Sequence, residues 1–237
     1  MSGTFIELDS SQLEGQDPSK MRITFPYPIT NPELKARLAL VKFNGYYSTY
    51  NVTSANNTLY YDDGSAQTIT IPPGIYTVED MSNEIESQIG ASTISFIPNY
   101  NTGKVYASIG ASYSIDWTQS TGLGALLGFT SAMGTQSSSG YGNVIANVNN
   151  GVVSWKVTCS LCRGKSFING ASSDVVAQFQ PRSPPYGSVD YEVLNLIYLP
   201  VQDEIIREME VKITDQSGNE LDFNGENVSI LFHLSME

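Results

Sequence analysis

Charged residues are scarce in this sequence, and the basic ones are scarcer still. Only 15% of its 237 residues are Asp, Glu, Lys or Arg, and the acidic residues outnumber the basic ones by 24 to 12. The formal net charge is therefore −12, whereas nucleic-acid-binding domains usually carry a basic excess or stripe. The nearest thing to a basic cluster, formed by Lys35, Arg37 and Lys42, is explained equally well by a solvated face. The charge balance argues against direct contact with nucleic acid.

Long apolar runs and cysteines are also missing. No stretch approaches the roughly 20 apolar residues of a membrane span, and residues 1–9 lack the basic start and apolar run of a signal peptide. Two cysteines in the whole chain do not make a disulfide framework. We therefore expect no membrane contact, synthesis in the cytosol, and thiols that stay reduced there.

What the chain does contain is a series of short alternating segments rich in Tyr, Ser, Thr, Asn and Gly. Outside residues 72–142 we count about eight such strands separated by turn signals, which predicts an antiparallel sandwich of the jelly-roll type. Pro26 and Pro28 confine the second strand to a sheet edge. A strongly apolar run, Val193–Leu199, reaches Pro200 near the end of the chain. The fold class is thus dominated by β-structure, with residues 1–71 and 143–237 forming the jelly roll.

A different pattern interrupts this series between residues 72 and 130. Thr77 and Asp80 have the spacing of a capping box, and an apolar stripe at helical spacing follows as far as Ile89. A hairpin and a short helix ending near Phe129 come next. We expect a small α+β insertion (helix, hairpin, short helix), followed by a mobile Ser/Gly-rich loop at 131–142. The polar segment Ser10–Lys20 reads as a loop or a flexible arm.

Two short motifs resemble known sites but fail on inspection. Cys159 and Cys162 have redox or zinc spacing, but no second ligand pair exists, and residues three apart on a strand face opposite sides. We interpret them as two structural thiols. Gly164-Lys165-Ser166 is similar to the end of a phosphate-binding loop. Cys159 stands where that loop needs its first glycine, and no helix pattern follows, so we reject the motif.

The remaining candidates for metal or catalytic chemistry are equally weak. Asp215, Ser217, Asn219 and Glu226 fall at calcium-loop positions, but the glycine that the loop requires is replaced by Glu220, so a hairpin turn explains the segment. His233 is the only histidine and lacks a nucleophile motif. We therefore predict no catalytic, cofactor-binding or metal-binding residues, no cofactor and no enzymatic activity.

Three asparagines fit the glycosylation pattern. They are found in Asn51-Val-Thr53, Asn56-Asn-Thr58 and Asn227-Val-Ser229. Because no signal peptide is evident, we interpret these matches as accidental.

Several of these segments, taken together, resemble a known family. The matching segments are the Ile71-Pro-Pro-Gly-Ile-Tyr76 start with its helix, the Leu126-Leu-Gly-Phe129 close, Asn195-Leu-Ile-Tyr-Leu-Pro200, Ile213-Thr-Asp-Gln-Ser-Gly218, Leu221-Asp222, Gly225-Glu226, and Val228-Ser-Ile-Leu-Phe-His-Leu234. Over residues 20–235 the chain is similar to the penton-type minor capsid proteins of Polinton-like viruses, adintoviruses and virophages. The resemblance implies a single jelly roll that assembles into a homopentamer at the vertices of a virion, beside a separate major capsid protein. The family has no catalytic residues to transfer to this chain.

A second interpretation stays open. A jelly roll can also serve as a binding module, such as a lectin or a receptor-binding fibre head, whose partner is a host receptor or glycan. Aromatic residues on loops would suit that role, and the candidates are Tyr46, Tyr47, Tyr50, Tyr100 and Tyr141. The competing explanation places the same tyrosines in the sandwich core or at a subunit interface.

Overall fold

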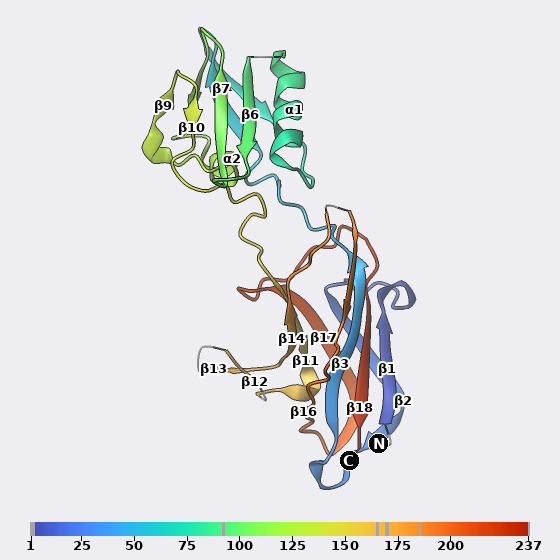
Figure 1. Cartoon of the computed structure of the whole chain (residues 1–237). Helices are drawn as coiled ribbons and strands as arrows, with labels where there is room; N and C mark the ends of the chain where they lie inside the picture. The colour runs from blue at the N-terminus through green and yellow to red at the C-terminus, as the bar shows by residue number, and fades with distance from the viewer. Residues whose placement is uncertain (1–2, 92, 165, 169–170, 185, 237) are drawn as a thin grey trace. The chain divides into compact units, whose positions relative to one another are not determined.

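The chain folds as two compact units. The computed structural model describes residues 3–91, 93–164, 166–168, 171–184 and 186–236. Unit 1 comprises Met1–Thr49 and Val152–Glu237, and unit 2 comprises Tyr50–Gly151. Each unit has its own apolar core, and both are drawn in Figure 1.

Unit 1 is a sandwich of two antiparallel sheets. One sheet has the order β1 (Gly3–Asp9), β18 (Ser229–Ser235), β3 (Arg37–Tyr46) and β15 (Ser188–Glu192), and β16 (Leu199–Pro200) also pairs with β3. The other has the order β14 (Val175–Phe179), β11 (Trp155–Cys159), β17 (Ile205–Asp215) and β2 (Lys20–Thr30). Taken in chain order, each sandwich strand is followed by one in the other sheet, except that β14 follows β11 in one sheet and β16 follows β15 in the other. This connectivity is that of a jelly roll, which confirms the predicted fold class.

Shorter elements complete unit 1. They are the 3-10 turns η1 (Ser10–Gln12), η2 (Pro32–Leu34) and η4 (Ser160–Cys162) and the hairpin of β12 (Ser166–Ile168) and β13 (Ala171–Ser173). Strand β2 lies at the end of its sheet, as Pro26 and Pro28 predict. Its pairing with β17 breaks between Ile206 and Glu208. The two prolines fall within this break, where no ladder hydrogen bond is lost.

Aromatic rings fill the space between the two sheets of unit 1. Trp155 is completely buried and packs edge-on against Phe43 and Phe223, with ring centroids 5.8 and 5.4 Å away. The alternation of β11 explains this position, because Trp155, Val157 and Cys159 share the buried face. Burial of each large side chain of this kind contributes about 1.5–3 kcal/mol to folding.

Unit 2 contains the predicted α+β insertion. Helix α1 (Val78–Ile89) begins at a complete capping box between Thr77 and Asp80. Two small antiparallel sheets accompany it. One has the order β10 (Gly140–Tyr141), β7 (Lys104–Ile109) and β6 (Ile94–Asn99), and the other β5 (Ala66–Thr70), β4 (Thr58–Asp62), β8 (Ser114–Asp116) and β9 (Thr135–Gln136). The unit also has the short helix α2 (Thr121–Leu127) and the turn η3 (Ser131–Met133).

Gly128 ends helix α2 in the left-handed region that favours glycine, at a φ of 84°. A Cβ atom at this position would lie 2.6 Å from the carbonyl oxygen of Val144. The helix can therefore turn back against the 144–146 segment only with glycine here.

The unit boundaries differ from those predicted at 71/72 and 142/143. Residues 50–71 belong to unit 2, because β4 pairs with β8 and because Leu59 and Ile69 lie in the second core. The alternation of these residues predicts strands correctly but cannot identify their partners. Residues 131–142 contain η3, β9 and β10 and are not a plain loop; their mobility remains a prediction.

The segment Ser10–Lys20 is also attached to unit 1. The backbone N–H of Ser10 donates to the Val228 carbonyl, and the side chain of Gln16 exchanges two hydrogen bonds with the backbone of Arg22. These bonds hold the segment against its own sandwich, so the loop interpretation describes it better than that of a flexible arm.

Candidate interaction surfaces

The two cysteines lie together in the core of unit 1. Strand β11 ends at Cys159, and the turn η4 carries Cys162 back toward it, so the expectation that the two face opposite sides is wrong. Both are buried free thiols. A hydrogen bond with Cys162, together with burial, raises the pKa of Cys159 well above its usual range. A protonated, buried thiol is a poor nucleophile and a poor metal ligand.

Asp215 organises a hairpin turn in the segment that we compared with a calcium loop. Its Oδ1 accepts hydrogen bonds from the N–H groups of Ser217 and Asn219, at 2.7 and 2.9 Å, and its Oδ2 accepts from the Asn219 amide at 2.8 Å. Burial raises the pKa of Asp215, but these bonds lower it by more, so the pKa lies below the usual range. The carboxylate oxygens are thus occupied by the turn itself.

The other weak motifs also have structural roles. His233 lies 5.0 Å from the Phe5 ring, and its Nδ1 is 2.8 Å from the Tyr198 hydroxyl. In the Gly164-Lys165-Ser166 motif, Lys165 lies outside the described residues.

Within the described part of the chain, no three His, Cys, Asp or Glu side chains are arranged to hold a metal ion. No helix among the same residues is long and apolar enough to cross a bilayer.

The three glycosylation-pattern asparagines differ in exposure. Asn51 is buried, and its amide donates to the carbonyls of Tyr76 and Val148, both at 2.7 Å. Asn56 is half-buried and accepts from the Thr53 N–H, while Asn227 is exposed. The first asparagine is therefore a structural link within unit 2.

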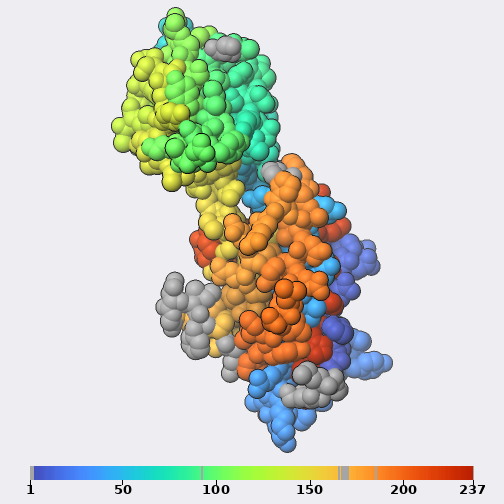
Figure 2. Space-filling view, in the orientation of Figure 1, coloured from blue at the N-terminus to red at the C-terminus, as the bar shows by residue number. Residues whose placement is uncertain are grey.

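The apolar run Val193–Leu199 leaves the sheet and becomes a surface feature. β15 ends at Glu192 and β16 begins at Leu199. Val193 still donates its N–H to the Val41 carbonyl of β3, and residues 194–198 belong to no strand. Leu194 is 93% exposed and Ile197 is 70% exposed, with Leu196 also exposed beside them. We call these three residues the 194–197 patch. The orange segment that contains it runs over the visible surface of unit 1 in Figure 2.

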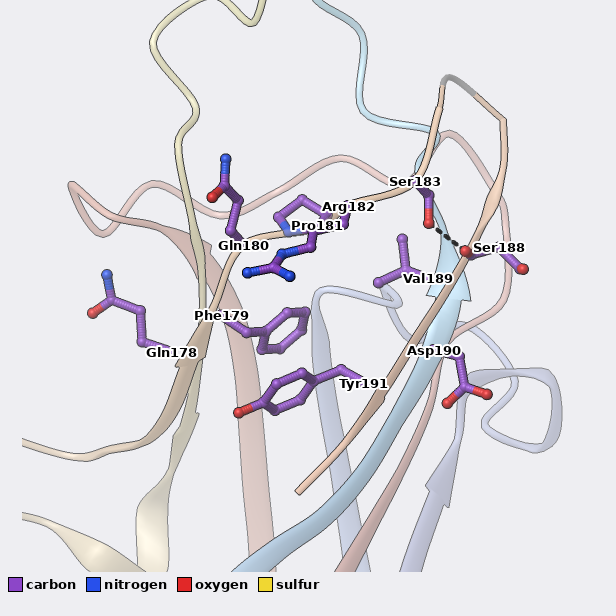
Figure 3. Close-up of a pocket in the computed structure, with 10 residues that line it drawn as sticks. All are labelled: Gln178, Phe179, Gln180, Pro181, Arg182, Ser183, Ser188, Val189, Asp190 and Tyr191. Carbon is purple, nitrogen blue, oxygen red and sulfur yellow. Dashed lines mark hydrogen bonds between the residues drawn. The ribbon is translucent and has the colours of Figure 1, made fainter. Parts of the chain in front are cut away.

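A pocket of about 570 Å³ lies between the edge strands β14 and β15 of unit 1. The Phe179 and Tyr191 rings lie face to face in it, with centroids 4.2 Å apart (Figure 3). Ser183 donates to the Ser188 carbonyl, and Asp190 pairs with Lys42 at 3.4 Å. Its titratable lining side chains are Arg182, Asp190 and Tyr191, and no histidine or lysine is among the described lining residues.

The five candidate tyrosines separate into three kinds. Tyr47 packs on Trp155 at 5.9 Å, and burial raises its pKa, so it is a core residue. Tyr46 and Tyr50 are exposed singly, in different units. Tyr100 and Tyr141 line one open hollow of unit 2, together with Tyr106. Tyr106 is not among the tyrosines expected from the sequence, although its alternation with Val105 and Ala107 places it on the outward face of β7.

Comparisons with known proteins extend this picture. No protein family model matches the sequence, and no curated protein matches it. A solved structure of the mavirus penton protein matches with a TM-score of 0.53 and 10% identity, covering 98% of this chain and 99% of that chain. A chain in a structure of the Sputnik virophage matches with a TM-score of 0.47 and 14% identity, covering 98% and 97%. From end to end, this chain has the fold of the mavirus penton protein.

Proposed function

We propose that the chain is a structural protein of a virion: a penton-type minor capsid protein that forms homopentamers at the vertices, beside a separate major capsid protein. The observation that carries the proposal is the likeness to the mavirus penton protein over nearly the whole of both chains. It extends through the jelly roll and the inserted unit alike, so it involves more than a shared sandwich.

One feature of unit 1 supports self-assembly. The 194–197 patch exposes three neighbouring large apolar side chains beside an edge strand, a costly arrangement in water unless a partner covers it. Identical subunits that pack head to tail through such a patch form a closed ring when the rotation between neighbours is a whole fraction of a turn. The net charge of −12 keeps separate subunits apart at low salt, and screening reduces that repulsion.

Size-exclusion chromatography with light scattering tests this proposal. We expect the purified chain to reach five times its mass of 25.8 kDa, with the pentamer fraction rising with salt concentration. The double variant Leu194→Ser/Ile197→Ser should shift the equilibrium toward monomer. Tyr27→Ser is the matched control, because Tyr27 is 82% exposed on β2 of the other sheet.

A chain that stays monomeric at every salt concentration, and that does not bind the major capsid protein of the same virion, would contradict the vertex role. Equal loss of assembly in the Tyr27→Ser control would show that the patch is not the contact. The proposal also implies a virion location after synthesis in the cytosol, with no direct contact to nucleic acid or membrane.

A binding module is the second candidate function, and unit 2 carries the observation that favours it. Tyr100, Tyr106 and Tyr141 line one open hollow, as expected for a surface that recognises a receptor or glycan. The two functions are compatible in one chain, because the tyrosines and the 194–197 patch belong to different units.

A further inference from the structure

The three-stranded sheet of unit 2 has one buried face and one face turned to solvent. On β6 and β7 the inward positions are apolar and fully buried, for example Phe96 and Ala107. The intervening residues point outward. The strand register aligns three of them in one row across the sheet, since Ile97 is opposite Tyr106 and Tyr106 is opposite Tyr141.

This outward row is aromatic and apolar where a solvated sheet face normally carries charged residues. Tyr141 is 50% exposed, and Ile97 is also exposed. The Tyr106 and Tyr141 rings meet edge to face, with centroids 5.1 Å apart. Together with the 98–101 turn they border an open hollow of about 600 Å³.

Amide groups lie beside the rings. The Asn99 Nδ2 is 3.4 Å from the Tyr141 hydroxyl, and its Oδ1 accepts from the N–H groups of Asn101 and Thr102. The Asn101 side chain lines the hollow and makes no hydrogen bond within the described part of the chain. Tyr100 is 83% exposed, and its hydroxyl donates to the Glu79 carboxylate, which fixes the ring at the rim.

The charges around the hollow favour a neutral ligand. The described residues that line the hollow include no charged side chain, and the neighbouring Glu79 carboxylate is bonded to the Tyr100 hydroxyl. The chain as a whole carries a net charge of −12, which repels anionic sugars and acidic surfaces. A cationic ligand would find no carboxylate among these described lining residues, and the Glu79 carboxylate is already bonded to Tyr100.

We propose that the outer face of the β6–β7–β10 sheet is a binding site for a neutral carbohydrate. The C–H face of a hexose ring stacks on the exposed Tyr141 ring, beside which Tyr106 lies edge to face, and its hydroxyl groups bond to the amides of Asn99 and Asn101. Rigid tyrosine rings with adaptable amides suit a small polar ligand with apolar faces. This inference rests on the binding-module function proposed above and names its ligand class. It does not depend on the vertex role, because every lining residue belongs to unit 2.

The test uses the full chain and a panel of neutral methyl glycosides, those of glucose, galactose, mannose, fucose and N-acetylglucosamine, at millimolar concentrations. Saturation-transfer NMR measures which glycoside contacts the protein, and titration measures its affinity. We expect at least one to bind, and Tyr141→Ala and Asn101→Ala each to weaken it by about tenfold. Tyr141→Phe should keep most of the affinity, because it keeps the ring.

Tyr27→Ala in unit 1 is the matched control and should bind like the parent chain. Unchanged Trp117 fluorescence, measured with Trp155 replaced by phenylalanine, shows that a unit 2 variant is still folded. The proposal is overturned if no glycoside binds, or if Tyr27→Ala loses as much affinity as Tyr141→Ala. It is also overturned if Tyr141→Ala abolishes only self-association or binding to capsid protein, since the face would then be a protein interface. A monomeric chain that still binds the sugar would contradict the vertex role alone.

Discussion

Trp117 and Phe129 stack face to face in the core of unit 2, with ring centroids 4.3 Å apart and planes 8° from parallel. The chain has two tryptophans, and the other, Trp155, lies in the core of unit 1. Each unit thus contains one intrinsic fluorescent probe. Replacing either tryptophan with phenylalanine leaves a chain whose emission reports on one unit.

Phe129→Ala should destabilise unit 2 by about 3–5 kcal/mol, because a large buried ring is lost and a cavity replaces it. Urea titration in a Trp155→Phe background measures the unfolding of unit 2 through the fluorescence of Trp117. Phe223→Ala, which removes the ring 5.4 Å from Trp155, is the counterpart in unit 1. The unfolding of unit 1 is followed through Trp155 in a Trp117→Phe background. If Phe129→Ala lowers the urea midpoint of the Trp155 transition as much as that of the Trp117 transition, the two cores do not unfold separately.

Thr77→Ala should cost unit 2 about 1 kcal/mol, since the Thr77 side chain accepts the Asp80 N–H at the start of α1. Ser87→Ala is the control on the same helix, because the Ser87 hydroxyl donates only to the exposed Glu84 carbonyl. Denaturant unfolding followed at Trp117 compares the two variants. A loss with Ser87→Ala equal to that with Thr77→Ala would rule out the capping box as the cause.

Asp215→Asn should destabilise unit 1 by about 1–2 kcal/mol at neutral pH, because the carboxylate accepts several hydrogen bonds in its turn. The pKa of Asp215 in the fold lies below its ordinary value of 3.8. The stability that the ionised Asp215 carboxylate gives to unit 1 is therefore fully present above pH 3.8 and is lost as the pH falls through the lowered pKa.

Thermal melts from pH 7 into the acid range measure the difference in melting temperature between the parent chain and Asp215→Asn. This difference, the gap, should be constant near neutrality and should close in strong acid. Asp203→Asn is the control, since the Asp203 carboxylate makes no hydrogen bond or ion pair within the described residues. A gap that widens on acidification would reverse the sign of the expected pKa shift.

The two thiols should resist modification in the folded chain. Cys159 and Cys162 are buried, and the raised pKa of Cys159 keeps its thiol protonated near pH 7. Dithionitrobenzoate should therefore label neither thiol in buffer but both in guanidinium. Cys159→Ala should leave one reactive thiol after denaturation. Rapid labelling of the native parent chain would show that the thiols are accessible.

Local sequence patterns determined much of the structure. The capping box and apolar stripe predict α1, because helix initiation depends on residues three or four apart. Alternation predicts the strands of the sandwich, and prolines at 26 and 28 place β2 at an edge, because proline cannot donate to a ladder. These signals are local, so they can be read without knowledge of the fold.

Tertiary structure decided which of these elements meet. Strand pairing joins residues far apart in the sequence, and alternation does not encode the partner. Only the fold therefore assigns β4 and β5 to unit 2 and brings Cys162 back beside Cys159. The fold also exposes Leu194 to water, although it lies in an apolar run. The aromatic row has the same origin: Tyr106 and Tyr141 are separated along the chain, and the register of β7 with β10 sets them side by side.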